Sequence, residues 1–296
     1  MSPTFHRYTA YDEDSARWTG FRFRDGDIVI STRSKSGTTW TQMICALLIF
    51  GTPEPPRPLP ELSPWLDHLV EPREAVIAAL EAQTHRRFIK THTPLDGVPV
   101  DPRAHYLVVF RHPLDMAVSL YHHGNNLDRD RVRELIGLPE PAEPEPPRPP
   151  LRDWLLEWID RDVDPREATD SLPGAMHHLR DAWERRDQPN ITLLHYADLK
   201  SDLDGQMRGL AERLGFEVDE RTWPRLVEAA TFEQMKSNNK KLAPDRSGVF
   251  KDAAAFFRQG RSGTGREVLT DAELARYHDR VADLAPSEAL EWLHRP

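Results

Sequence analysis

Cysteine is nearly absent from this chain of 296 residues, in which Cys45 is the only one. A single thiol cannot form an intramolecular disulfide, so a secreted domain held together by disulfides is excluded and a cytoplasmic protein is expected. Cys45 stands within the apolar segment 40–50, where we expect a buried and unreactive side chain.

Long apolar runs are also lacking. The longest one, near residues 44–50, is far shorter than the roughly 20 residues that cross a bilayer. The N-terminus, Met-Ser-Pro-Thr-Phe-His, has no apolar stretch typical of a signal peptide. We therefore expect no integral association with a membrane.

Basic residues are in deficit. The sequence has 39 Lys and Arg residues against 48 Asp and Glu residues, which gives a formal net charge of −9. An extended surface for nucleic acid is not expected at this charge, and an anionic ligand would have to be held by a few local cations. The apolar share of 39% still supports a sizeable core.

Strand patterns alternate with helix patterns along most of the chain. Apolar runs predict strands at 28–30, 87–91, 106–110 and 191–196, with 21–30 forming a hairpin around Asp25-Gly26. Helices are predicted at 40–50, 74–83, 113–123, 151–159, 203–214 and 225–230, and a capping box at 270–273 predicts a last helix. This order predicts one α/β domain over residues 1–296, with a central, mostly parallel sheet flanked by helices.

Two proline-rich segments interrupt the pattern. Residues 52–64 form a connector, and residues 139–150 contain seven prolines and four charged residues. The second segment is typical of a loop, either a flap over a substrate or a solvated excursion on the surface. Both segments are candidate walls of a substrate pocket.

The segment from Asp27 to Trp40 is the most informative feature. An apolar strand enters a short turn that carries Lys35 and Gly37, and the turn opens an apolar helix. The first N–H groups of a helix lack partners, and the helix dipole favours negative charge there. Gly37 lets the backbone approach a phosphate, and Lys35 adds a mobile positive charge. The sequence therefore predicts a P-loop-like anion site.

Further polar residues follow other predicted strands. Lys35, His92, Arg111 and Tyr196 all stand at or just past the carboxyl ends of strands. Ligands of parallel sheets bind beyond these ends, so the four side chains should meet at one site.

The turn does not match the nucleotide triphosphatase loop, G-x-x-x-x-G-K-S/T, because its lysine precedes the glycine and its first glycine is missing. The run Lys35-Ser36-Gly37-Thr38-Thr39-Trp40 instead resembles the 5′-phosphosulfate loop of the cytosolic-type sulfotransferases, which use 3′-phosphoadenosine 5′-phosphosulfate (PAPS). Together with four further segments in the same order, the resemblance spans roughly residues 20–270.

These four segments imply particular roles. The run 88–92 resembles the Lys-Thr-His segment, whose histidine is the catalytic base, and 109–123 resembles the segment that binds the 3′-phosphate. The run 231–238 resembles a wall of the adenine pocket, and 257–260 resembles the C-terminal Arg-Lys-Gly loop, also a 3′-phosphate contact.

The resemblance implies a set of site residues. His92 is the expected general base, and Lys35 with the N–H groups of Thr38 and Thr39 would oppose charge on the leaving phosphate. Lys90 lies on the same strand face as His92, where it could contact the transferred sulfuryl group. The remaining expected contacts of the nucleotide are Ser36, Gly37, Trp40, Arg111, Ser119, Tyr196, Phe232, Met235, Arg258, Gln259 and Gly260.

The chain departs from the family pattern at its C-terminal end. Gln259 stands where the family has lysine, so one phosphate cation is lost or replaced by a neutral donor. The usual Gly-Asp-Trp is absent, and residues 263–266 occupy the area. The family's dimerisation pattern survives only as Arg266 and Thr270, so the oligomeric state is left open.

Several alternatives stay open at this point. The same anion loop could serve a small-molecule or nucleoside kinase that uses ATP, or a nucleotide-binding module without activity. Arg111 could simply pair with Asp115, and His122 could line the acceptor pocket. The histidine pairs 122–123 and 177–178 lack a metal-binding pattern, so no metal is expected. The preferred interpretation is transfer from PAPS to a hydroxyl, or less readily an amine, of a small or lipid-like acceptor.

Overall fold

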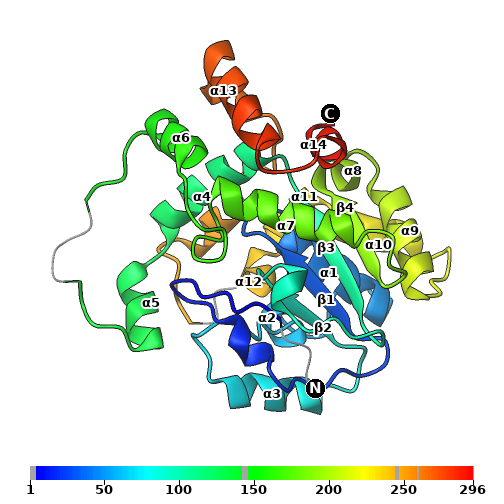
Figure 1. The fold of residues 1–296 in the computed structure, drawn as a ribbon. Helices are drawn as coiled ribbons and strands as arrows, with labels where there is room; N and C mark the ends of the chain where they lie inside the picture. Colours follow the sequence, from blue (N-terminus) through cyan, green and yellow to red (C-terminus); the bar gives the residue numbers. More distant parts are fainter. Residues whose placement is uncertain (1–4, 142–145, 244–246, 259, 296) are drawn as a thin grey trace.

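The computed structural model describes residues 5–141, 146–243, 247–258 and 260–295, and a four-stranded sheet lies at its centre (Figure 1). The strands are β1 (Ile28–Thr32), β2 (Phe88–Thr91), β3 (His105–Phe110) and β4 (Ile191–His195), in the spatial order β2-β1-β3-β4. All three pairings are parallel, and the sheet is flanked by helices. The predicted α/β class is confirmed.

Alternate strand residues face two separate hydrophobic clusters. Val29 and Val108 belong to the cluster on one face of the sheet, while Ile30 and Leu107 belong to the cluster on the other face. Because both faces are covered, the strands read as continuous apolar runs instead of alternating patterns. Cys45 is fully buried in the second cluster, as its apolar surroundings predicted.

The predicted helices form within a few residues of their expected bounds, and the capping box of Thr270 and Glu273 is present. The covering of the sheet also includes helices that the sequence pattern did not reveal, notably α7 and α14. The α-helices of the described chain are α1 (Thr38–Phe50), α2 (Leu59–Leu62), α3 (Arg73–Ala82), α4 (Pro113–Asn126), α5 (Arg129–Ile136), α6 (Leu151–Asp160), α7 (Leu172–Glu184), α8 (Tyr196–Ser201), α9 (Leu203–Leu214), α10 (Trp223–Ala229), α11 (Phe232–Ser237), α12 (Asn239–Leu242), α13 (Asp271–Ala282) and α14 (Ser287–His294). The 3₁₀ helices are η1 (Ser15–Trp18), η2 (Leu95–Gly97), η3 (Ala253–Phe256) and η4 (Arg266–Val268).

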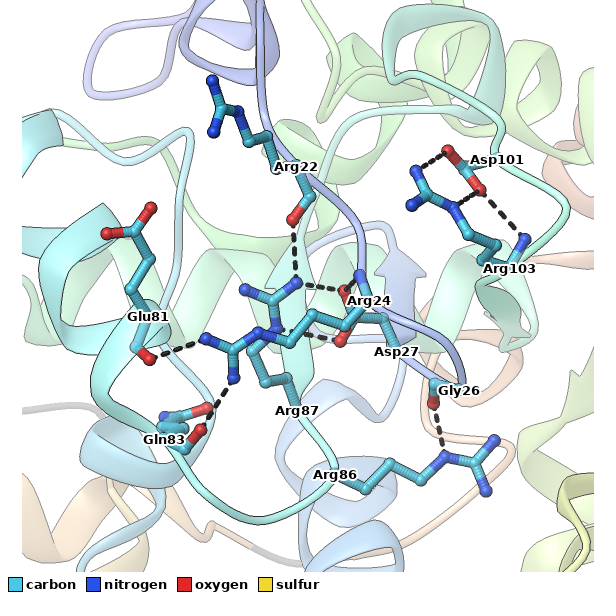
Figure 2. Close-up of polar contacts among 10 residues, drawn as sticks. All are labelled: Arg22, Arg24, Gly26, Asp27, Glu81, Gln83, Arg86, Arg87, Asp101 and Arg103. Carbon is cyan, nitrogen blue, oxygen red and sulfur yellow. Dashed lines mark hydrogen bonds and ion pairs between the residues drawn. The ribbon is translucent and has the colours of Figure 1, made fainter.

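The predicted hairpin at 21–30 does not form. The turn at Asp25-Gly26 is present, and Gly26 has a φ of 83°. However, β1 is a central strand whose two edges are already taken by β2 and β3, so residues 21–24 find no edge to pair with. Side chains hold the turn instead (Figure 2): the buried Arg87 guanidinium binds the Asp27 carboxylate and the Arg22 carbonyl oxygen.

No helix of the described residues is both long enough and apolar enough to pass through a lipid bilayer.

Candidate active site

The carboxyl ends of β1, β2 and β3 open into a cavity of about 390 Å³. Lys35, His92, Arg111 and Tyr196, which stand at or past four different strand ends, all line it, as the sheet topology predicted. The other expected site residues on its walls are Gly37, Thr38, Thr39, Trp40, Lys90, Ser119, Phe232, Met235, Arg258 and Gly260. Ser36 is buried in the turn behind the wall, and Gln259 lies outside the described residues.

The turn between β1 and α1 has the backbone shape of an anion site. Lys35 and Gly37 both lie in the left-handed region, with φ values of 65° and 115°. Helix α1 starts at Thr38 without a side-chain cap, so its first N–H groups are directed to the cavity end of the helix without an internal partner. Such a turn curves successive N–H groups around a negative charge. Ser36 is not free to join them, because its N–H donates to the Arg33 carbonyl oxygen at 3.1 Å.

His92 is held in one tautomer. Its Nδ1 lies 2.6 Å from the Thr32 carbonyl oxygen, which can only accept, so Nδ1 carries the proton and Nε2 keeps its lone pair. The residue is only 6% exposed. Burial first, and then the positive charges of Lys90 and Arg33, place the His92 pKa well below its ordinary value of about 6.5. The imidazole is therefore neutral at pH 7 and can accept a proton at Nε2.

Trp65 organises the two polar side chains at the end of β2. The Lys90 Nζ lies 3.6 Å from the centre of the Trp65 ring, and the His92 ring meets Trp65 edge-on with centroids 4.7 Å apart. His68 stacks on Trp65 at 4.0 Å. Burial lowers the Lys90 pKa to about 8, and it does so more than nearby carboxylates such as Glu13 raise it.

Lys35 stands among other cations. Its Nζ lies 4.3 Å from the centre of the Phe256 ring. Burial first, and then repulsion from Arg111 and Lys90, lower the Lys35 pKa to about 7. A desolvated ammonium among like charges gains most from an anion that binds beside it.

Arg111 marks a second cationic region. Its guanidinium donates to the Lys35 carbonyl oxygen at 3.3 Å and to the Arg261 carbonyl oxygen at 2.9 Å, and it lies 4.6 Å from the Tyr196 ring. The buried Nε has no hydrogen-bond partner within the described chain. Arg111 therefore links the anion turn to the C-terminal loop and does not pair with Asp115. Ser119 and Arg258 line the cavity with it.

Asp115 anchors the C-terminal loop instead. Its buried carboxylate accepts hydrogen bonds from the N–H groups of Gly263 and Gly265, at 2.8 and 2.9 Å, and from the Thr264 hydroxyl at 3.1 Å. The segment 263–266, which departs from the family pattern, is thus tied to the start of α4. The same loop brings Gly260 against Phe232, where an added Cβ would stand 2.7 Å from the ring.

Aromatic side chains close the region between the anion turn and this loop. Trp40 and Tyr196 meet edge-on with centroids 5.2 Å apart, and the Trp40 Nε1 donates to the Ala230 carbonyl oxygen at 2.8 Å. Phe232 and Phe257 lie close by on the cavity wall, with centroids 6.2 Å apart. These rings form a slot suited to a planar base.

The acceptor side differs from expectation in two respects. His123 lines the cavity and His122 does not, since neighbouring residues of α4 point in different directions. The connector 52–64 does supply a wall through Leu59, Pro60 and Ser63. None of the described residues of 139–150 lines the cavity; Arg148 donates instead to the Tyr121 carbonyl oxygen of α4 at 2.7 Å.

Other residues of the site carried no recognisable sequence signal. Trp65 is a single aromatic directly after the proline-rich connector, and Arg33 is a single basic residue beside the turn. The buried Arg33 donates to the His92 carbonyl oxygen and pairs with Asp170 at 2.7 Å, so it fixes the backbone of the expected base. No cluster of His, Cys, Asp and Glu suited to a metal occurs among the described residues.

Helix α1 begins without a side-chain cap after β1, the turn before it holds Lys35 in the left-handed region, and several cations converge there. These features are typical of an α/β protein that binds an anionic group at a P-loop-like turn. Residues 25–294 match the Sulfotransferase domain family. A glycolipid sulfotransferase of Mycobacterium bovis is 39% identical over 97% of this chain and 93% of its own. The chain therefore belongs to the sulfotransferase family and is a sulfotransferase.

Solved structures show the same fold at low sequence identity. A retinol dehydratase in complex with androsterone and the inactive cofactor PAP is 22% identical, with a TM-score of 0.68 over 91% of this chain and 83% of that one. A mouse sulfotransferase complexed with PAP is 19% identical, with a TM-score of 0.66 over 94% and 92% of the two chains.

Proposed function

We propose that this sulfotransferase takes its sulfuryl group from PAPS and transfers it to a hydroxyl of a glycolipid-like acceptor. The observation that carries the proposal is that the unprotonated Nε2 of His92 and the cationic turn at Lys35 belong to the same cavity. The glycolipid part draws on the activity named for the mycobacterial relative. Residues 1–296 are proposed to act as one domain, in the cytoplasm.

The residues present suit this donor. The uncapped start of α1 with the left-handed Gly37 fits a 5′-phosphosulfate, and the unpaired Nε of Arg111 offers a charged donor to a second phosphate. Trp40 and Phe232 border a slot for adenine. The two separate cationic regions suit PAPS, which carries a 3′-phosphate in addition to its 5′-phosphosulfate, and not ATP, which has no 3′-phosphate. The kinase alternative is not favoured, since the family match covers nearly the whole chain.

When bound, PAPS supplies a sulfuryl group whose bond to the 5′-phosphate oxygen breaks as sulfur bonds to the acceptor oxygen. His92 takes the acceptor proton at Nε2, and the Thr32 carbonyl oxygen holds the imidazolium through Nδ1–H. Lys35 and the first N–H groups of α1 oppose the charge that builds on the phosphate oxygen. Lys90, whose ammonium group lies over the Trp65 ring, is proposed to contact the transferred group.

A direct test measures sulfated product from PAPS and an alkyl glycoside, together with the affinity for PAP, the bisphosphate product, and for ATP with Mg²⁺. We expect turnover with PAPS and much tighter binding of PAP than of ATP. Tighter binding of ATP with Mg²⁺ than of PAP, or a complete absence of sulfated product across sugar, phenol and amine acceptors, contradicts the proposal.

Binding of PAP should take up protons above neutral pH. The Lys35 pKa of about 7 in the ligand-free protein leaves this side chain largely neutral at pH 8, and a neighbouring phosphate raises its pKa again. Lys90, with a pKa of about 8, can add to the uptake. At pH 8 the calorimetric enthalpy of PAP binding should therefore depend on the ionisation enthalpy of the buffer, and at pH 6, where Lys35 is already protonated, it should depend far less.

The variant Lys35→Met is the control for this effect, since it removes the titrating group that contributes most. Equal binding enthalpies in phosphate and Tris buffers at pH 8 for the wild-type protein contradict the lowered pKa.

Substitution of Gly37 should weaken donor binding. The variant Gly37→Ala places a side chain at a φ of 115° and a Cβ 3.2 Å from the Tyr196 ring. A left-handed conformation costs an L-residue about 1–2 kcal/mol, so the turn is expected to relax away from its anion-binding shape and PAP affinity to fall roughly tenfold. Calorimetry with PAP measures the loss.

The matched control is Gly209→Ala. Gly209 lies within α9, and an added Cβ would meet nothing within 4 Å. It should leave PAP affinity unchanged and should stabilise the protein slightly. Equal PAP affinity in both alanine variants means that the turn does not need a glycine.

A further inference from the structure

The cavity continues past Lys90 and His92 into a part lined by carboxylates. Asp12, Glu13 and Asp170 all border it. Two of these side chains have ion-pair partners: Asp12 pairs with His68 at 3.3 Å, and Asp170 pairs with Arg33 at 2.7 Å. Glu13 is 9% exposed, and its carboxyl group has no hydrogen-bond or ion-pair partner among the described residues. A buried polar group that faces a cavity without a partner indicates a ligand contact.

The backbone around Glu13 is firmly placed. Residues 9–14 lie along residues 65–69, with an antiparallel bridge between Glu13 and His68. The Leu69 N–H donates to the Asp12 carbonyl oxygen at 2.8 Å, and the Asp14 N–H donates to the Asp67 carbonyl oxygen at 2.8 Å. The N-terminal segment thus presents Glu13 beside the wall that holds Trp65 and Lys90.

The carboxyl groups in this part of the cavity, those of Asp12, Glu13 and Asp170, disfavour an anionic acceptor. Burial first, and then the neighbouring charge of Asp12, raise the Glu13 pKa well above its ordinary value. Glu13 lies close enough to Lys90 for a negative charge on its carboxylate to raise the Lys90 pKa. The raised Glu13 pKa favours the protonated carboxyl group, which both donates and accepts a hydrogen bond, as a sugar hydroxyl does. An uncharged polyhydroxyl ring suits this wall better than a sulfate, a carboxylate or a plain hydrocarbon.

Another wall of the cavity is apolar and begins beside Lys35. The Lys35 Nζ lies over Phe256, which contacts Phe250 with centroids 5.6 Å apart, and Phe250 contacts His123 at 5.3 Å. Burial lowers the His123 pKa to about 3, so its ring is uncharged at pH 7. Leu127 continues this wall, bridged to Phe250 through the backbone.

We propose that Glu13 binds hydroxyl groups of the acceptor's sugar ring next to the hydroxyl that is sulfated, and that Leu127 and Phe250 hold its apolar chain. The acceptor is then a neutral amphiphile that enters with its polar end first. This inference rests on the proposed sulfotransferase function and assigns the specificity of the same cavity.

The test compares three acceptors: octyl glucoside below its micelle-forming concentration, methyl glucoside and 2-naphthol. For Glu13→Ala we expect KM for both glucosides to rise tenfold or more, with less than a twofold change for 2-naphthol and for PAP affinity. Glu13→Gln, which keeps one donor and one acceptor, should retain most of the glucoside activity. For Leu127→Ala the advantage of octyl over methyl glucoside should shrink several-fold, while methyl glucoside is unaffected.

The control variant is Glu212→Ala, an exposed carboxylate on α9 that should change no acceptor. Equal losses for glucosides and 2-naphthol in Glu13→Ala overturn the assignment of Glu13, because a general distortion would affect both. Turnover of 2-naphthol without turnover of either glucoside by the wild-type protein overturns the sugar assignment and leaves the sulfotransferase function standing. Failure to bind PAP and to sulfate any acceptor overturns the proposed function and this inference together.

Discussion

Replacing His92 with alanine is expected to lower kcat for sulfuryl transfer by about 10²–10⁴, the usual contribution of a positioned general base. The reason is the bare Nε2, which the hydrogen bond from Nδ1 to the Thr32 carbonyl oxygen keeps available for the acceptor proton. PAP affinity should change little, because His92 acts on the acceptor and not on the phosphates. Steady-state kinetics and calorimetry on the same preparations separate these two effects.

The pH dependence adds a second check on His92. Because its pKa lies well below about 6.5, the neutral base persists below that pH, and protonation of His92 should not reduce the wild-type rate between pH 8 and pH 6.5. The control His278→Ala, an exposed histidine on α13, should keep full activity. A His92→Ala enzyme that retains more than a tenth of the wild-type kcat is inconsistent with a base at this position.

The sequence allowed us to predict that the residues expected to bind the donor meet in one cavity, because their signals are local. A lysine-bearing turn between a strand and a helix, and polar residues directly after strands, are encoded within a few residues each. Parallel strand ends meet at one edge, so these local signals also fix a shared location, and Lys35, His92 and Arg111 do line one cavity.

The acceptor side could not be predicted because it depends on contacts between distant segments. Glu13 reaches the cavity only because residues 9–14 lie along residues 65–69, and no sequence pattern in either segment predicts that pairing. The sequence offered Asp115 only as an alternative partner of Arg111, yet its carboxylate accepts hydrogen bonds from the loop at 263–265. In each case a tertiary contact, and not a local preference, decides the role.

Local preference was also overridden within the fold. The Asp25-Gly26 turn formed as its sequence predicts, but the hairpin did not, because both edges of β1 have parallel partners. Residue type alone also could not predict that His123, and not its neighbour His122 on α4, faces the cavity.

Replacing Lys35 with methionine is expected to lower kcat by about 10²–10³, because it removes one preorganised cation from the leaving phosphate oxygen. Methionine keeps much of the length and the contact with Phe256 while it deletes the charge. PAP already carries the charge that develops during transfer, so its affinity should fall together with kcat. Glucoside KM should change little, since Lys35 stands at the donor end.

This paired loss distinguishes Lys35 from His92, for which kcat alone is expected to fall. The control Lys200→Met, an exposed lysine on α8, should leave both quantities unchanged. A Lys35→Met enzyme with reduced kcat but unaltered PAP affinity places the cation on the sulfuryl oxygens and not on the leaving phosphate, in the position expected of Lys90. Unaltered kcat and unaltered PAP affinity together mean that the N–H groups at the start of α1 suffice to hold the donor without Lys35.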